Sequence, residues 1–434
     1  MARAASLSRL SPLLVACAVG GAACSGTGTK PVPLDQPVFP LGMALSPDGD
    51  RLLVSSSNFD FSYDSGAVLL ANVAGIRADL LAGKDEAAVV AAPYVSAVRV
   101  PEFADRLVFD AAGDSALFTT RDGNLLHEVA VDGDDVSCGD AAVCNVSPNA
   151  LQLSGNDPFD VVVLSDDGVI LRGLVSHLGS AQAEIFVLDK SKTDAKRLTI
   201  EAGELDFARA VETSTGVRSA VERPAHDGFG ASIFAAVERR EEGVLVGVDL
   251  VSFATPAPGR ANEAVFRRQD ITAQIGTRSV RDMAVIEGDD GDAALIVLLQ
   301  NPDGIARFTI DDDDRLTLSV LDNTCVQPLG LAVAALDTDG AAGVDVTRLI
   351  VTCHGSNEVV ALDPRTLRVT DTSRFYGRGP YDVVVDATNN VAWVSFFLDN
   401  SVGAYRLVDD DGAFRMTPIG RLGAALPRPE DGRE

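Results

Sequence analysis

The chain has 434 residues, of which 46% are hydrophobic and 23% are charged, so it carries enough apolar material for a large core. Its 63 acidic residues against 36 basic ones give a formal net charge of −27. A field of this sign repels phosphate backbones, which excludes nucleic acid as an expected partner.

The N-terminus has the features of an export signal. Arg3 and Arg9 form a basic start, and the apolar stretch over residues 10–23 is too short to span a bilayer as a permanent helix. We therefore predict a signal peptide over residues 1–23. Residues 24–37 are rich in Gly, Thr and Pro and are predicted to form a flexible tether.

The signal ends in Gly21-Ala-Ala-Cys24, which resembles a bacterial lipobox, the small-residue run before a Cys that becomes acylated with palmitate. Gly21 departs from that pattern, because Leu is usual there. Leu14-Val-Ala-Cys17 offers Cys17 as an alternative acylation site, and an ordinary cleaved signal is a further alternative. Ser25 after the anchor favours the outer membrane, by analogy with enterobacterial lipoproteins. We expect a lipid-anchored protein on its periplasmic or cell-surface side.

The rest of the chain repeats a six-residue phrase. It reads Pro40-Leu-Gly-Met-Ala-Leu45 and returns at 158–163, 328–333 and 380–385, with a looser copy lacking the proline at 280–285. The wide gaps leave room for two degenerate units, around residues 106–131 and 218–250. Repeated units that are built of short strands and turns are typical of β-propeller blades. We predict an all-β propeller over residues 38–425 and a disordered tail over 426–434.

The sixth unit shows the expected blade most clearly. Four short strands are predicted, over residues 328–333, 348–353, 358–363 and 367–370, which suits a four-stranded antiparallel blade. The count that fits best is seven blades, with six or eight left open because the fourth unit lacks a clean opening phrase. The ring closes either through the tail at 415–422 alone or with a strand from the segment after Pro33.

Four cysteines remain once Cys17 and Cys24 at the N-terminus are set aside from the six in the chain. An even number in an exported protein predicts disulfides. Cys138 and Cys144 lie close together in a polar loop, and Cys325 and Cys353 lie within the sixth unit. We predict both pairs to be bonded, the alternative being free buried thiols.

Two units carry further motif residues. In the first, the phrase continues as Ser-Pro-Asp-Gly49 and is followed by Arg51-Leu-Leu-Val54 and Asn58; the seventh contains Val391-Ala-Trp-Val-Ser395 and Asn400-Ser-Val-Gly-Ala-Tyr405. These residues resemble the YVTN-type repeat of bacterial β-propellers, a group close to NHL and lactonase-like propellers. The resemblance covers nearly all of residues 38–425. It implies the fold and leaves the function open, because propellers host many activities.

The resemblance also implies that the opening phrase lies on the inner strand of each blade, so that its third position recurs around one mouth of the central channel. Four carboxylates and one adjacent arginine are expected there: Asp105, Asp160, Asp282, Asp382 and Arg281. Carboxylates that face one opening repel one another unless a cation or basic side chains offset them. A Ca²⁺ ion or a cationic ligand is one hypothesis. The alternative is that each Asp accepts backbone N–H groups at its strand start. No other cofactor is expected.

Catalytic motifs are absent from the sequence: there is no Gly-x-Ser-x-Gly, no phosphate-binding loop and no His-Glu-x-x-His. His354 is expected to be a solvated loop residue, and Trp393 and Phe396-Phe397 are expected to pack between blades.

Three functions are consistent with these features. The first is a lipid-anchored, monomeric binding or scaffold propeller that recognises a protein, peptide or glycan in the envelope, without catalysis. The second is a lactonase-like hydrolase in which channel carboxylates hold a divalent metal that activates water. The third is an accessory subunit of an envelope redox or transport assembly. We favour recognition over catalysis.

Overall fold

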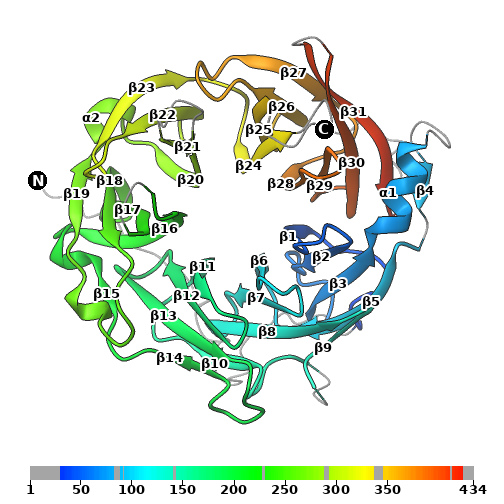
Figure 1. Ribbon diagram of the computed structural model, residues 1–434, viewed down its shortest axis with the longest axis horizontal. Coiled ribbons are helices and arrows are strands. Elements are labelled where there is room, and N and C mark those ends of the chain that lie inside the picture. Colours follow the sequence, from blue (N-terminus) through cyan, green and yellow to red (C-terminus); the bar gives the residue numbers. More distant parts are fainter. Residues whose placement is uncertain are drawn as a thin grey trace, which may run out of the picture.

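Seven sheets surround a common axis in the computed structural model, which describes residues 30–82, 88–90, 92–139, 143–226, 230–287, 293–336, 346–410 and 413–423 (Figure 1). Each sheet is a blade whose four main strands are antiparallel, and the blades follow the chain around the ring. The fold is a seven-bladed β-propeller, so the prediction of seven blades is confirmed.

In each blade the four main strands follow one another in chain order from the axis outward. Blade 1 contains β1 (Pro40–Leu45), β2 (Arg51–Ser56), β3 (Gly66–Asn72) and β5 (Tyr94–Val100). Blade 2 contains β6 (Ala104–Phe109), β7 (Ser115–Thr120), β8 (Leu125–Asp132) and β10 (Ala150–Gln152). Blade 3 contains β11 (Pro158–Asp166), β12 (Ile170–His177), β13 (Gln182–Asp189) and β14 (Leu198–Ile200). Blade 4 contains β16 (Ser214–Arg223), β17 (Ser232–Glu241), β18 (Val244–Ala254) and β19 (Arg267–Asp270).

Blade 5 contains β20 (Ser279–Ile286), β21 (Ala294–Gln300), β22 (Gly304–Ile310) and β23 (Leu316–Asp322). Blade 6 contains β24 (Pro328–Leu336), β25 (Val346–Cys353), β26 (Glu358–Leu362) and β27 (Val369–Arg374). Blade 7 contains β28 (Pro380–Asp386), β29 (Val391–Phe396), β30 (Ser401–Asp410) and β31 (Ala413–Leu422). The remaining elements decorate the blades: β4 (Ala88–Val90), β9 (Asp135–Ser137), β15 (Leu205–Asp206), α1 (Val73–Leu81), α2 (Thr272–Ile275), η1 (Phe207–Arg209) and η2 (Ala261–Glu263).

The ring closes between blade 7 and blade 1. β31 is blade 7's own outer strand, as one of the two sequence alternatives predicts. The added strand is β4, which leaves the β3–β5 connection of blade 1 and pairs in parallel with residues 420–422 of β31. It does not come from the segment after Pro33.

A bulge near the start of the inner strand recurs in every blade. In blade 1 the register with β2 is interrupted between Pro40 and Met43, and the corresponding interruption lies between Ala104 and Leu107 in blade 2. Aligned on this bulge, the third position holds Gly42, Arg106, Asp160, Ser219, Asp282, Gly330 and Asp382 in blades 1 to 7. The second position holds Leu41, Asp105, Phe159, Arg218, Arg281, Leu329 and Tyr381. Asp105 is therefore one residue away from the third position expected for it.

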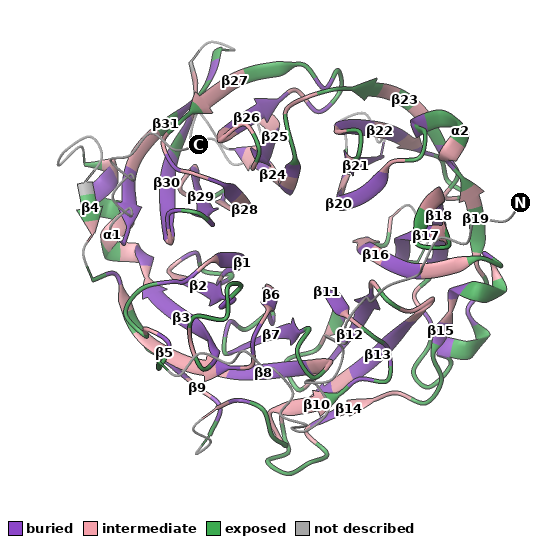
Figure 2. Cartoon of the chain, turned by 180° about the vertical axis from the view of Figure 1, so that it is seen from behind, coloured by how far each residue is buried: buried purple, intermediate pink, exposed green. Residues whose placement is uncertain are grey.

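The apolar core consists of layers between neighbouring blades. Seven main clusters of buried side chains each join two adjacent sheets, as sheet-on-sheet packing requires. Trp393 of blade 7, fully buried, packs with Leu52 and Val54 of blade 1, which confirms it as a packing residue. The outer strands β19, β23 and β27 carry mostly exposed or half-exposed residues (Figure 2).

Local predictions are mostly confirmed. The structure contains both disulfides, Cys138–Cys144 and Cys325–Cys353. In the sixth unit the outer strand begins at Val369 and not at Leu367, because Leu367 has a positive φ of 56° and ends the preceding turn.

The N-terminal predictions fall largely outside the described residues. Cys17, Cys24 and the signal over 1–23 lie outside them, as does the tail over 426–434. Within the stretch predicted as a tether, Lys30 bridges Tyr63 and the buried Val32 packs on blade 1. In the part of the chain that the structure describes, no helix is long and apolar enough to cross a membrane.

Candidate functional site

Three third-position aspartates lie buried around the axis and link neighbouring blades. Asp382 Oδ1 accepts the N–H of Val383 (2.9 Å), and its Oδ2 accepts the N–H of Met43 in blade 1 (2.8 Å). Asp282 repeats this arrangement with Met283 (2.8 Å) and Leu331 of blade 6 (2.9 Å).

Asp160 makes the same two kinds of contact in blade 3. Its Oδ1 accepts the N–H of Val161 (3.1 Å), and its Oδ2 accepts the N–H of Ala220 in blade 4 (3.4 Å). These side chains thus serve their own strand start and the next blade, a role close to the second of the two alternatives for the aspartates.

Glycine occupies the third position in blades 1 and 6, where backbone atoms of the next blade lie close to it. A Cβ on Gly42 would lie 2.4 Å from the backbone oxygen of Asp105, and one on Gly330 would lie 2.7 Å from the backbone oxygen of Tyr381. The backbone of the next blade therefore leaves no room for a side chain at these two third positions.

Arg106 supplies positive charge to the aspartates. It extends from blade 2 to form an ion pair with Asp282 of blade 5, and its Nη1 lies 3.8 Å from Asp160 Oδ2. One arginine offsets three carboxylates only in part. Burial raises the pKa of Asp160, and it raises the pKa of Asp382 to about 6, although Arg106 opposes both shifts.

The contacts of the axial aspartates argue against the Ca²⁺ hypothesis. Within the ranges that the structure describes, no three His, Cys, Asp or Glu side chains are placed to hold a metal ion. The oxygens of Asp160, Asp282 and Asp382 already accept N–H groups or contact Arg106. These residues do not fit a metal centre, and we derive no chemical step through one.

The second-position residues form a different group, which contains two arginines against aromatic rings. The guanidinium carbon of Arg281 lies 4.9 Å from the ring centroid of Phe159 and 5.2 Å from that of Tyr381, and its Nη2 donates to the Tyr381 hydroxyl (2.7 Å). The guanidinium carbon of Arg218 lies 5.7 Å from the same Phe159 ring. Phe159 is buried, so the two cations lie on one apolar support.

Neither arginine is neutralised by a carboxylate at ion-pair distance among the described residues. Arg281 is buried, with 6% of its surface exposed, and the Nε atoms of Arg218 and Arg281 are buried without a hydrogen-bond partner. Burial lowers the pKa of Arg218; Glu238 opposes this shift, and Arg281 adds to it. Glu238 is already paired with Arg240 at 2.8 Å. Unsatisfied buried donors of this kind call for an explanation.

Asp105 and His354 lie within the electrostatic influence of Arg281. Burial raises the pKa of Asp105, and Arg281, Arg106 and Arg121 oppose that shift. His354 is half-buried, and burial lowers its pKa, with Arg281 adding to the effect. Its ring stands edge-on to Tyr381, with ring centroids 6.4 Å apart. His354 is therefore not the freely solvated loop residue expected from the sequence.

The other buried histidines are occupied by local contacts. His127 stacks on Phe118 and lies 2.8 Å from Thr120 Oγ1, and burial lowers its pKa to about 4. His177 Nε2 lies 3.0 Å from Glu184.

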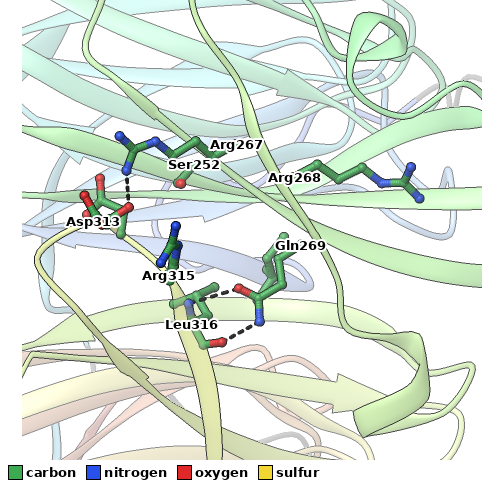
Figure 3. A pocket seen from close by; sticks show the side chains of 9 residues that line it. Ser252, Arg267, Arg268, Gln269, Asp313, Arg315 and Leu316 are labelled. Atoms are coloured by element: carbon green, nitrogen blue, oxygen red, sulfur yellow. Dashed lines mark hydrogen bonds between the residues drawn. The ribbon is translucent and has the colours of Figure 1, made fainter.

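A cavity of about 350 Å³ lies far from the axis, between the outer strands β19 and β23 (Figure 3). Gln269 bridges the two strands, accepting the N–H of Leu316 (3.0 Å) and donating to its carbonyl oxygen. Arg267 donates to the backbone oxygen of Asp313. These contacts join blades 4 and 5 at the rim, and the cavity shares no residue with the group at the axis.

Sequence reasoning found Arg281 and three of the aspartates but missed Arg106 and Arg218. The signal for Arg218 is visible in retrospect: Val217-Arg-Ser-Ala in the fourth unit matches Val280-Arg-Asp-Met in the fifth. Arg106 has no such signal, because its position follows only from the bulge register.

Comparison with known proteins places the fold. No family model matches the chain, and no curated protein sequence matches it significantly. Among solved structures it is similar to the periplasmic gluconolactonase PpgL of Pseudomonas aeruginosa, with a TM-score of 0.53 and 15% identity over 79% of this chain and 87% of that one. It is also similar to a proposed 6-phosphogluconolactonase of Bacteroides uniformis, with a TM-score of 0.55 and 16% identity over 87% and 98%. The β-propeller domain of Myceliophteria thermophila Cps50 (Swd1) gives a TM-score of 0.53 and 8% identity over 84% and 96%. At these identities the likeness concerns the fold alone.

Proposed function

We propose that this protein is a recognition propeller of the bacterial envelope that binds a small organic anion at the second-position group on its axis. The observation that carries the proposal is the pair Arg218 and Arg281, which share the Phe159 ring and lack a carboxylate partner among the described residues. Arginine presents a planar fork of donors that matches a carboxylate, and the interaction strengthens where water is excluded.

The chemistry of the surroundings supports a carboxylate ligand. Arg106 contacts the carboxylates of Asp160 and Asp282, which compensate its positive charge, so it would attract an anionic ligand only weakly. Arg218 and Arg281 instead have uncommitted nitrogens. The sequence left open a protein, peptide or glycan partner. We now propose more specifically that the ligand carries a carboxylate group.

Export and anchoring are part of the proposal. The basic and apolar N-terminus supports a signal peptide, and Cys24 in its lipobox-like run supports acylation there, with Cys17 as the alternative. Two disulfides are typical of an oxidising compartment outside the cytoplasm. We propose an outer-membrane lipoprotein, monomeric, facing the periplasm or the cell surface.

Lactone hydrolysis is a second candidate function. It is favoured by the fold likeness to one propeller described as a gluconolactonase and one described as a proposed 6-phosphogluconolactonase, and by the electrostatic interaction of Asp105 with Arg281. Arg218 and Arg281 would stabilise the oxyanion that forms when water attacks the lactone carbonyl. Asp105 or His354 would take the proton from that water and return it to the ring oxygen when the ring C–O bond breaks. This reading uses no metal.

Calorimetric titration separates the proposal from its alternatives. The purified exported protein is titrated with gluconate and hexanoate, alongside the variants Arg218→Gln and Arg281→Gln and the exposed rim control Arg315→Gln. Binding of either acid that is lost in the two axial variants and kept in the control supports the proposal. No binding of either acid, or equal binding in all four proteins, contradicts it. Opening of glucono-lactone that depends on Arg281 and Asp105 would favour the second candidate.

A further inference from the structure

A row of aromatic rings leads from the exposed face to Arg281. The ring centroids of Phe61 and Phe103 lie 5.2 Å apart, and those of Phe103 and Phe59 lie 6.1 Å apart. Phe59 then contacts Phe397 at 5.5 Å. We call these four residues, together with Phe39, the aromatic row.

The aromatic row continues, ring to ring, to Tyr381 of the second-position group. Phe397 packs on Phe39, with ring centroids 4.9 Å apart, and stacks with Tyr381 at 5.8 Å and an interplanar angle of 27°. Tyr381 in turn accepts the hydrogen bond from Arg281. Blades 1, 2 and 7 thus contribute one continuous aromatic path to the cations.

Part of the row is open to solvent. Phe59 is 54% exposed and Phe61 is 44% exposed, whereas Phe397 is 9% exposed. Both exposed rings contact the half-buried Phe103. Exposed rings joined in this way and leading to a polar group are typical of a binding surface and not of scattered surface residues. Phe397 of blade 7 contacts Phe39 and Phe59 of blade 1, so it packs between blades as expected, and Phe59 and Phe61 form the open part of the row.

Two rings of the row occupy a backbone position that recurs in other blades. Phe39 and Phe103 each stand directly before an inner strand with positive φ angles of 48° and 57°, and Phe61 has a φ of 56°. Blades 3, 6 and 7 have Asp157, Gln327 and Gly379 at the same place, with φ angles of 59°, 53° and 60°. The left-handed conformation therefore belongs to the fold and does not require a phenyl ring. The rings of Phe39 and Phe103 distinguish blades 1 and 2 from these blades.

The far end of the row is acidic. Glu102, directly before Phe103, lines a cavity of about 410 Å³ together with Asp64 and Asp122. Burial raises the pKa of Glu102, and Asp122 raises it further, so negative charge is already disfavoured there. A ligand with a second carboxylate at that end would be repelled.

We propose that the ligand is a monocarboxylic acid with an apolar aryl or alkyl tail, whose carboxylate pairs with Arg218 and Arg281 and whose tail lies along the aromatic row. This inference rests on the proposed function and names its ligand class. It differs from a polyhydroxylated sugar acid, whose hydroxyl groups would lose hydrogen bonds to water against bare phenyl rings.

Two acids matched in carbon number and charge test the inference: hexanoate and gluconate. We expect calorimetry to show hexanoate bound at least tenfold more tightly than gluconate by the unaltered protein. Phe397→Leu and Phe59→Ala, at the rings of the row that follow Tyr381, should each weaken hexanoate binding severalfold and leave gluconate unchanged. Phe375→Ala is the matched control, because Phe375 is 68% exposed and lies outside the row.

The possible outcomes distinguish the preference for an apolar tail from the existence of the anion site. Gluconate bound as tightly as hexanoate, or hexanoate binding that both Phe variants leave unchanged, would overturn the apolar tail while keeping the anion site, provided that Arg218→Gln still abolishes binding. No binding of either acid would overturn the anion site itself. Far-ultraviolet circular dichroism and melting temperature of each variant exclude misfolding as the cause of a loss.

Discussion

Arg106 of blade 2 forms an ion pair with Asp282 of blade 5, so one side chain reaches across the axis between blades that are not neighbours. The Asp282 side chain is buried, and the Arg106 side chain is 25% exposed. The pair therefore contributes both charge compensation and a direct link through the centre of the ring.

Replacing Arg106 by leucine should destabilise the protein strongly. The change leaves Asp160, Asp282 and Asp382 buried without their common counter-charge, and losing one partner of a buried ion pair costs about 3–5 kcal/mol. Urea unfolding at pH 7.5 measures the effect. Arg121→Leu is the control on the same blade, since the side chains of its pair with Asp157 are 40% and 34% exposed and the pair should contribute about 1 kcal/mol or less. Equal losses in the two variants would contradict the proposed role of Arg106.

Asp382 should give the protein a pH-dependent instability. Its folded pKa of about 6 lies above the usual 3.8, so the folded state holds a proton that the unfolded state has released between these values. Stability contributed by this group therefore falls as the pH rises from about 4 to about 6, by up to about 3 kcal/mol.

The comparison of wild type with Asp382→Asn isolates this contribution from other titrating groups. The difference in unfolding free energy between them should change in favour of the variant across pH 4 to 6.5 and stay constant above pH 7. The variant also loses one backbone hydrogen bond, which shifts the whole curve without changing its slope. A difference that is flat with pH would mean that Asp382 titrates normally.

Gly42→Ala should weaken the contact between blades 1 and 2. The new methyl group would lie 2.4 Å from the backbone oxygen of Asp105, which cannot move without shifting β6. Overpacking of this kind costs about 1–3 kcal/mol. Gly75→Ala provides the control, because nothing lies within 4 Å of that added methyl group and the residue is inside α1. There alanine should stabilise by up to about 1 kcal/mol. Thermal unfolding of both variants checks the two signs.

The two disulfides should differ in their contribution to stability. Cys325–Cys353 closes a loop with a sequence separation of 28, and Cys138–Cys144 one with a separation of 6. Loop-closure entropy gives about 3–4 kcal/mol for the longer loop and about 2 kcal/mol for the shorter one. Double replacement by alanine of each pair, followed by urea unfolding, tests this order. A larger loss from the shorter loop would show that packing in the native state outweighs loop entropy.

Calcium should not bind through the axial aspartates. Titration of the chelator-treated protein should give no heat beyond dilution, because the oxygens of Asp160, Asp282 and Asp382 already serve backbone N–H groups and Arg106. The triple variant with Asn at these positions is the matched comparison. Micromolar binding in the wild type that this variant loses would restore the metal hypothesis.

The repeats predict the architecture because each phrase encodes its own inner strand. The gathering of Asp160, Asp282 and Asp382 around the axis was likewise predictable from their shared place in the phrase. The register of Asp105 and Arg106 was not predictable, because the second unit lacks the phrase. Both residues lie in the bulge between Ala104 and Leu107, and the spacing of the sequence does not show which of them takes the third position.

The aromatic row was beyond sequence analysis for a different reason. Its members come from four separate connecting segments, with Phe59 and Phe61 sharing one of them, and show no periodicity. The contact between Phe39 and Phe397 exists only because the ring brings blade 7 back to blade 1. Such a juxtaposition depends on the number of blades and on the angle between them.

The way the ring closes has a consequence for how the chain could be rearranged. Each blade takes its four main strands from one continuous segment, and only the short β4 is borrowed across the junction between blades 7 and 1. Apart from this short parallel pairing, no blade in the described part of the chain shares a strand with another. The starting point of the chain is then structurally arbitrary, and a circular permutant opened in any loop between blades would retain every complete sheet. Whole blades, and not strands, are the units by which such a chain can lengthen, shorten or exchange parts.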